Sequence, residues 1–179
     1  KNRTFVQAHG TGTPQNRTTE SHILSQIAGI FGIENWPIAA VKSYLGHSIA
    51  SSAGDQLVAT LGSFAHGILP GILTIDEIAE DVTQENLDFL LAHRELPLNS
   101  IDATIINSKG FGGNNASASI LAPHIVEKML EKRHGANALK DYKKRNEQVV
   151  DKMAAYDQAM IEGRNNTIYK FDHNVLDNE

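Results

Sequence analysis

The chain has 179 residues, a formal net charge of -5, 41% hydrophobic residues and 21% charged residues, a composition typical of a globular protein with its own core. The negative charge argues against a protein that binds nucleic acid mainly through electrostatic attraction. No apolar run is long enough to cross a bilayer, and no basic segment followed by an apolar stretch opens the sequence. We therefore expect a cytoplasmic protein without a membrane span and without a nucleic-acid partner.

The charged residues divide the chain near residue 126. Residues 1–126 contain six Lys/Arg and eleven Asp/Glu, whereas the much shorter segment 127–179 contains ten of each. We predict a domain over residues 1–126 and a charged, helical extension over residues 127–179. The sequence begins without Met and with a segment that reads as an interior strand, so we expect it to be part of a longer protein.

Strands and helices are expected to alternate over residues 1–126. A strand ends at Ala8, and a helix begins at about residue 18 with an apolar face formed by Ile23, Ile27, Ile30 and Phe31. A short strand over 38–41 precedes a second helix over about 50–65. One face of this second helix comprises Ala50, Ala53, Gly54, Leu57 and Leu61. Its first residues are small, which suits a close approach to another backbone.

Residues 71–100 show only connections with short strands or turns. Beyond them, a β-branched strand over 101–106 and a return strand over 116–121 flank a Gly-rich turn. This order of elements predicts a layered α/β fold with a mixed sheet.

The first candidate for chemistry is the segment from His9 to Pro14, which reads HGTGTP. A histidine just beyond the end of a strand faces the crevice where α/β folds bind ligands. The glycines allow close approach of a substrate to the backbone, and Thr11 and Thr13 offer hydroxyl groups. Taken alone, however, a Thr/Gly turn with a structural histidine explains the segment better.

The second candidate runs from Lys42 to His47, again between a strand and a helix. The positive end of a helix dipole disfavours imidazolium, so His47 is expected to stay neutral and donate a hydrogen bond. Lys42 is a candidate partner for a carboxylate such as Glu20. The alternatives are a solvated lysine at a strand end and a histidine that caps a helix.

The third candidate is the turn from Gly110 to Asn115, which reads GFGGNN. Backbone N–H groups in such a turn can contribute to an oxyanion hole; the alternative is an ordinary tight turn. No dinucleotide or Walker motif is present, and no HExxH or i,i+4 histidine pair suggests a metal site. We expect neither a metal nor another cofactor.

In this order, the three segments (residues 8–14, 41–47 and 107–116) resemble the β-ketoacyl-[acyl carrier protein] synthases. The resemblance covers roughly residues 4–126 and implies the C-terminal half of that family's thiolase-like fold. It also implies that the cysteine nucleophile lies in an N-terminal half, which these 179 residues, with no cysteine, do not contain. The implied partners are this N-terminal half, an acyl carrier protein with a phosphopantetheine-linked acyl or malonyl group, and a second copy in a homodimer.

The resemblance also assigns roles to individual residues. It makes His9 and His47 the pair that promotes decarboxylation of a malonyl thioester, and Lys42 the residue that orients the His9 region with Glu20 as its partner. Contacts to phosphopantetheine fall to Thr11 and Thr13. The gate of the pocket and the second oxyanion donor fall to Phe111, within the turn formed by Gly110, Gly112 and their neighbours.

Four positions depart from the family pattern: Gln7, Arg17, Lys109 and Asn114. Arg17 bears on the lysine–carboxylate network, and Lys109 on the wall of the pocket. A second interpretation is a non-catalytic partner subunit of the chain-length-factor kind. Such subunits tend to lose active-site residues, whereas the candidate residues are present here. A thiolase without decarboxylation would be expected to carry a second cysteine near the Gly-rich turn.

Overall fold

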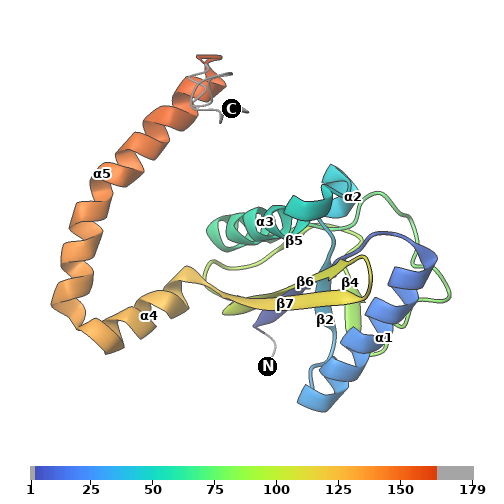
Figure 1. Ribbon diagram of the computed structural model, residues 1–179. Helices are drawn as coiled ribbons and strands as arrows, with labels where there is room; N and C mark the ends of the chain where they lie inside the picture. The colour runs from blue at the N-terminus through green and yellow to red at the C-terminus, as the bar shows by residue number, and fades with distance from the viewer. Residues whose placement is uncertain (1–2, 165–179) are drawn as a thin grey trace, which may run out of the picture. The chain divides into compact units, whose positions relative to one another are not determined.

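The structure is a computed structural model that describes residues 3–164 (Figure 1). The chain forms two compact units that separate between Lys128 and Met129, and we describe each unit by itself. In the part that the structure describes, no helix is both long enough and apolar enough to span a membrane.

The first unit is built on a five-stranded sheet with the order β4-β2-β1-β6-β7. Its strands are β1 (Thr4–Gln7), β2 (Trp36–Ala39), β4 (Leu87–Phe89), β6 (Ala103–Gly110) and β7 (Asn114–Leu121). The strands β4, β2, β1 and β6 are parallel to one another, and β7 returns antiparallel to β6. A second, two-stranded antiparallel sheet is formed by β3 (Ile68–Leu69) and β5 (Arg94–Glu95).

The helices of the first unit are α1 (Pro14–Phe31), the single turn α2 (Lys42–Leu45), the 3-10 turn η1 (Ile49–Ser51) and α3 (Ser52–His66). Helix α4 (Pro123–His134) spans the boundary between the units. The second unit contains α5 (Ala136–Ile161), so the helix expected in the charged extension is present. Residues 165–179 of the predicted extension lie outside the described residues.

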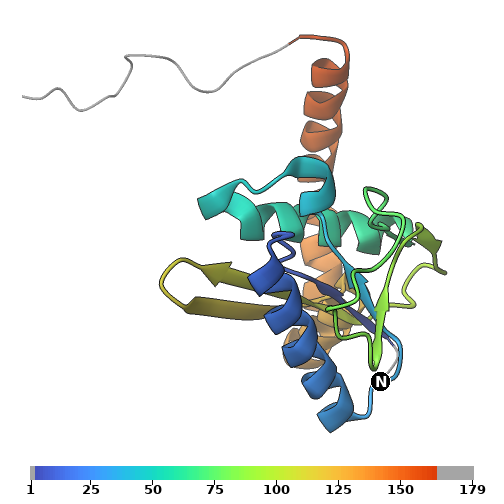
Figure 2. The ribbon, with the colours of Figure 1, turned by 90° about the vertical axis from the view of Figure 1, so that its right-hand side faces the viewer.

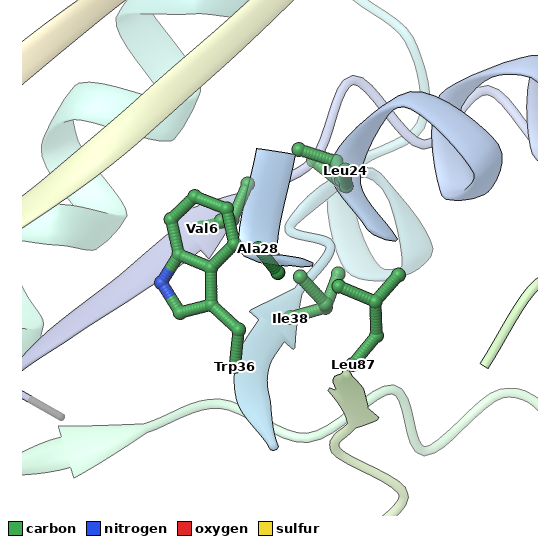
Figure 3. Close-up of a cluster of buried hydrophobic side chains, with 7 residues drawn as sticks. Val6, Leu24, Ala28, Trp36, Ile38 and Leu87 are labelled. Carbon is green, nitrogen blue, oxygen red and sulfur yellow. The ribbon is translucent and has the colours of Figure 1, made fainter. Parts of the chain in front are cut away.

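Alternate side chains of the central strands build a core on each face of the sheet. Val6 and Ile38 pack with Leu24 and Ala28 of α1 in the cluster shown in Figure 3. The neighbouring residue Phe5 packs in a second cluster, which includes Phe64 of α3. Because successive side chains of a strand point to opposite faces, α1 and α3 cover opposite faces of the sheet, as Figure 2 shows.

The apolar face predicted for α1 is wrong. Ile23, Ile30 and Phe31 are exposed, and only Ile27 packs against the core. The buried positions of α1 are Glu20, Ser21, Leu24, Ser25 and Ala28. The helix also begins four residues earlier than expected, because the hydroxyl of Thr13 accepts the N–H of Asn16 at 3.4 Å and Pro14 fits the first turn.

The inward face of α3 was also predicted incorrectly. Leu57 and Leu61 are exposed, and a Cβ placed on Gly54 would meet open space. The buried side chains are instead polar: Ser52, Gln56, Thr60 and Ser63. The order of strands and helices around the three motifs, in contrast, was predicted correctly, including the hairpin that joins β6 to β7.

Candidate active site

The three sequence motifs meet at one edge of the sheet. Strands β2, β1 and β6 are parallel neighbours, so their carboxyl ends lie together. His9 follows β1, the segment from Lys42 to His47 follows β2, and the Gly-rich turn follows β6. The topology therefore converts three motifs distant in sequence into one site.

His9 and His47 form an edge-to-face pair at the centre of this site. Their ring centroids are 5.3 Å apart, and the ring planes are inclined by 86°. His9 is only 3% exposed, whereas His47 is exposed. Both rings line a groove of about 840 Å³. The other predicted site residues on this groove are Thr11, Thr13, Gly110, Phe111 and Gly112.

The surroundings of His9 favour its neutral form. Burial lowers the pKa of its imidazole below the ordinary 6.5, and the nearby positive charge of Lys42 lowers it further, against an opposing effect of Glu20. A neutral imidazole carries one N–H donor, whereas an imidazolium would add a full positive charge to the groove. The site thus holds His9 as a neutral hydrogen-bonding group at pH 7.

The backbone determines the hydrogen-bonding role of His47. The N–H of Ile49 donates to Nδ1 of His47 at 3.0 Å, so a neutral ring carries its proton on Nε2. Ile49 adopts a positive φ of 57°, which is rare for a β-branched residue. This backbone conformation presents the N–H group to the ring and leaves Nε2 as the donor.

The carboxylate of Glu20 organises the loop that carries His9. Its Oε1 accepts the backbone N–H of His9 at 2.8 Å and the side-chain amide of Asn107 at 2.6 Å. Its Oε2 accepts the backbone N–H of Gly10 and the amide of Asn16, both at 3.0 Å. Four N–H donors therefore bind one buried carboxylate, which connects the end of β1, helix α1 and strand β6.

Lys42 and Glu20 do not form the expected direct contact. Lys42 Nζ is buried without a hydrogen-bond partner among the described residues. Four N–H groups already donate hydrogen bonds to the two oxygens of Glu20, so this carboxylate is satisfied without a bond from Lys42. Burial lowers the pKa of Lys42 below 10.5, while Glu20 and Asp55 act in the opposite direction. Lys42 thus acts on His9 through its charge.

The two charged departures from the family pattern leave the Glu20 network intact. Arg17 binds Asp81 in a two-point ion pair, with Nε to Oδ1 at 2.9 Å and Nη2 to Oδ2 at 2.9 Å. It therefore does not compete for Glu20. Lys109 lies on the groove wall, and its Nζ donates to Thr19 Oγ1 at 3.4 Å.

Sequence reasoning missed the side chain that connects α3 to the site. Gln56 is fully buried, and its Nε2 donates to the backbone carbonyl of Ala8 at 2.6 Å, of Asn107 at 3.1 Å and of Gln7 at 3.2 Å. These carbonyls lie at the end of β1 and within β6. The signal in the sequence was the spacing of polar residues at positions 52, 56, 60 and 63, which lie on one face of a helix.

The Gly-rich turn lies at the tip of the β6–β7 hairpin. Phe111 is 93% exposed there, and its carbonyl accepts the side-chain amide of Asn114 at 3.0 Å. Gly112 and Gly113 adopt φ values of 78° and 82°, which side chains with a Cβ rarely tolerate. Across the groove, the hydroxyls of Thr11 and Thr13 are hydrogen-bonded to each other at 3.1 Å.

Comparison with known proteins identifies this arrangement. Residues 3–76 match the β-ketoacyl synthase C-terminal domain. The chain is 48% identical over 178 residues to the β-ketoacyl-[acyl-carrier-protein] synthase FabY of Pseudomonas aeruginosa, covering 99% of this chain and 28% of that protein. These matches show a β-ketoacyl synthase C-terminal domain. The chain corresponds to the C-terminal portion of FabY and spans about a quarter of the length of the bacterial synthases that it matches.

Other matches cover a smaller share of the chain. The chain is 30% identical to 3-oxoacyl-[acyl-carrier-protein] synthase 1 of Escherichia coli, but this match covers only 63% of the chain and 26% of that protein. A synthase structure from Burkholderia phymatum covers 68% of the chain and 28% of that protein, at 26% identity and a TM-score of 0.57.

The FabY crystal structure from P. aeruginosa, in contrast, covers 98% of the chain and 27% of that protein, at 48% identity and a TM-score of 0.90. A match of this extent includes most of the charged extension, so this chain shares the extension with FabY.

Among the described residues, no group of histidine and carboxylate side chains is arranged to hold a metal ion.

Proposed function

We propose that these residues form the decarboxylation part of a synthase that joins an acyl group to a malonyl group by a Claisen condensation. The observation that carries the proposal is the pair of rings at 5.3 Å, His9 kept neutral by burial and His47 with Nε2 as its donor. The names of the relatives indicate an acyl carrier protein as the carrier of the substrates. Fatty-acid synthesis, or polyketide synthesis by the same chemistry, is the proposed pathway class.

The proposed chemistry follows from the charge that develops in the reaction. The bond between the malonyl α-carbon and its carboxyl group breaks, carbon dioxide leaves, and the electron pair moves toward the thioester oxygen as an enolate. Two neutral N–H donors stabilise this oxygen more in the transition state than in the ground state. The α-carbon then attacks an acyl thioester on a cysteine, and the cysteine sulfur leaves as thiolate.

The remaining site residues have supporting roles in this proposal. Thr11 and Thr13 contact the phosphopantetheine arm, and the exposed Phe111 gates the groove while its N–H contributes to the oxyanion hole. Lys42 tunes His9 through its charge, whereas Glu20 holds the backbone of the loop that carries His9. The cysteine belongs to another part of the whole protein, in a homodimer, and residues 127–179 form a segment outside the catalytic domain. Because these 179 residues contain no cysteine, the isolated chain is proposed to be inactive in condensation.

The test is an assay of the whole protein with malonyl-carrier protein. His9→Ala and His47→Ala should each reduce decarboxylation about 100-fold or more, the usual size of a lost donor to a developing oxyanion. Acylation of the cysteine, followed by mass spectrometry, should continue in both variants and serves as the control for folding. Unchanged decarboxylation in both variants would contradict the proposal, whereas absence of condensation in the unchanged whole protein would favour a chain-length-factor-like subunit.

A further inference from the structure

Helix α5 is long, charged and without any buried residue. It extends over 26 residues from Ala136 to Ile161, about 39 Å at 1.5 Å per residue (Figure 1). Its apolar side chains are open to solvent; Val149, for example, is 51% exposed and Met153 is 61% exposed. Because a helix in water obtains most of its stability from packing an amphipathic face, α5 needs a partner for this face.

Six apolar or aromatic residues of α5, together with one asparagine, follow a heptad pattern; Val150 and Ile161 lie outside it. Seven positions recur at alternating intervals of three and four residues, and together we call them the seam. The seam comprises Leu139, Tyr142, Asn146, Val149, Met153, Tyr156 and Met160. Spacing of this kind, with an average of 3.5 residues, keeps one stripe facing a second helix in a left-handed coiled coil. The opposite face is polar and comprises Lys144, Asp151 and Gln158.

The single polar residue of the seam is Asn146, at the position written a in the heptad convention. An asparagine at one a position specifies register and partner number in paired helices, because its amide can donate to and accept from the same residue of a second copy. Lys152 and Asp157 flank the seam at positions g and e. In a parallel pair, each lysine faces the aspartate of the partner helix, so the charges are complementary to themselves.

We propose that α5 pairs in parallel with α5 of a second copy of this chain, as a two-stranded coiled coil along the seam. Two features favour a second copy over another partner: Asn146 is matched by itself, and the charges at 152 and 157 are matched across a two-fold axis. An antiparallel pair along the same seam would place the two copies of Lys152 next to each other. The proposal concerns the extension and is independent of the catalytic site.

The absence of cysteine from these 179 residues allows a direct test. In the 179-residue chain, Val149→Cys should form a disulfide-linked dimer under mild oxidation, because the two copies of a residue at position d lie next to each other in a parallel pair. Asp151→Cys, on the opposite face, is the matched control and should remain unlinked. Circular dichroism checks that both variants keep the helix.

Each other outcome contradicts the proposal. Absence of a Val149→Cys dimer would mean that the seam faces a different partner or a different part of the whole protein. Efficient linking only between a Val149→Cys chain and a Met153→Cys chain would indicate an antiparallel pair. Equal linking of the Val149→Cys variant and the Asp151→Cys control would indicate random collision rather than pairing.

The charge pattern provides a second measurement in the Val149→Cys background. Lys152→Glu should lower the yield of linked dimer about threefold, because it places like charges beside Asp157 of the partner helix. Adding Asp157→Lys should restore the yield. If neither Lys152→Glu nor the added Asp157→Lys changes the yield of linked dimer, the parallel arrangement is wrong.

Discussion

At the scale of single residues, the site depends on one buried carboxylate. The carboxylate of Glu20 accepts the backbone N–H groups of His9 and Gly10 and the side-chain amides of Asn16 and Asn107. A charged acceptor strengthens each of these bonds. The position of the His9 ring is therefore set by a residue on the first turns of α1, eleven positions away in the sequence.

This arrangement predicts the effect of Glu20→Gln. The amide offers one acceptor oxygen and introduces an N–H₂ group that faces other donors, so buried N–H groups lose their partners. We expect a loss of about 1–3 kcal/mol in the free energy of unfolding, measured by urea denaturation of the whole protein. Glu34→Gln, the same change at an exposed position, is the control and should alter stability by less than about 0.5 kcal/mol.

The charge of Lys42 predicts a shift in pH dependence. Lys42 lowers the pKa of His9, so Lys42→Met should let this pKa rise toward 6.5. The neutral form of His9 would then be lost at a higher pH, and the acid limb of the decarboxylation profile should move upward. Lys109→Met removes a smaller effect on the same pKa and should give a smaller shift in the same direction. A shift of the Lys42→Met profile to lower pH would show that its charge is not what tunes His9.

At the scale of elements, the strands were predictable and the buried faces of the helices were not. Each strand beside a motif shows β-branched or apolar residues next to a turn, a local signal. Hydrophobic periodicity, however, carries no information about hydrogen bonds to the backbone. Glu20 and Gln56 are buried because they form such bonds. The bond between Glu20 and Asn107 joins residues 87 positions apart, and no local pattern anticipates it.

Gln56 gives this element-scale argument a test. Gln56→Leu removes the donor to the carbonyls of Ala8 and Asn107, so α3 loses its polar contact with the ends of β1 and β6. We expect about 1–3 kcal/mol less stability and a reduced rate of decarboxylation, measured on the whole protein. Gln26→Leu, the same substitution at an exposed position of α1, should change neither value. Equal effects of the two substitutions would contradict this role for Gln56.

At the scale of the whole molecule, the first unit exposes a strand edge and an apolar helix face of the kind that is buried inside a complete domain. Strand β7 has no strand partner on its outer side within the described residues, and its side chains are largely exposed. The outward face of α3 carries Leu57, Val58 and Leu61 in contact with solvent. Open strand edges and apolar helix faces of this kind favour association with other polypeptide. We propose that the rest of the whole protein packs against them.

A charge introduced on α3 distinguishes the chain from the whole protein. Val58 is 71% exposed in the 179-residue chain. Val58→Lys should therefore change the free energy of unfolding of this chain by less than about 0.5 kcal/mol. It should also reduce self-association of the chain, measured by light scattering. In the whole protein the same lysine would be buried without a partner, and the melting temperature should fall. Gln148→Lys, on exposed α5, should be neutral in both settings. A whole protein that tolerates Val58→Lys equally well would show that this face of α3 stays in water, and the surface that receives the cysteine-bearing part would then have to lie elsewhere on the first unit.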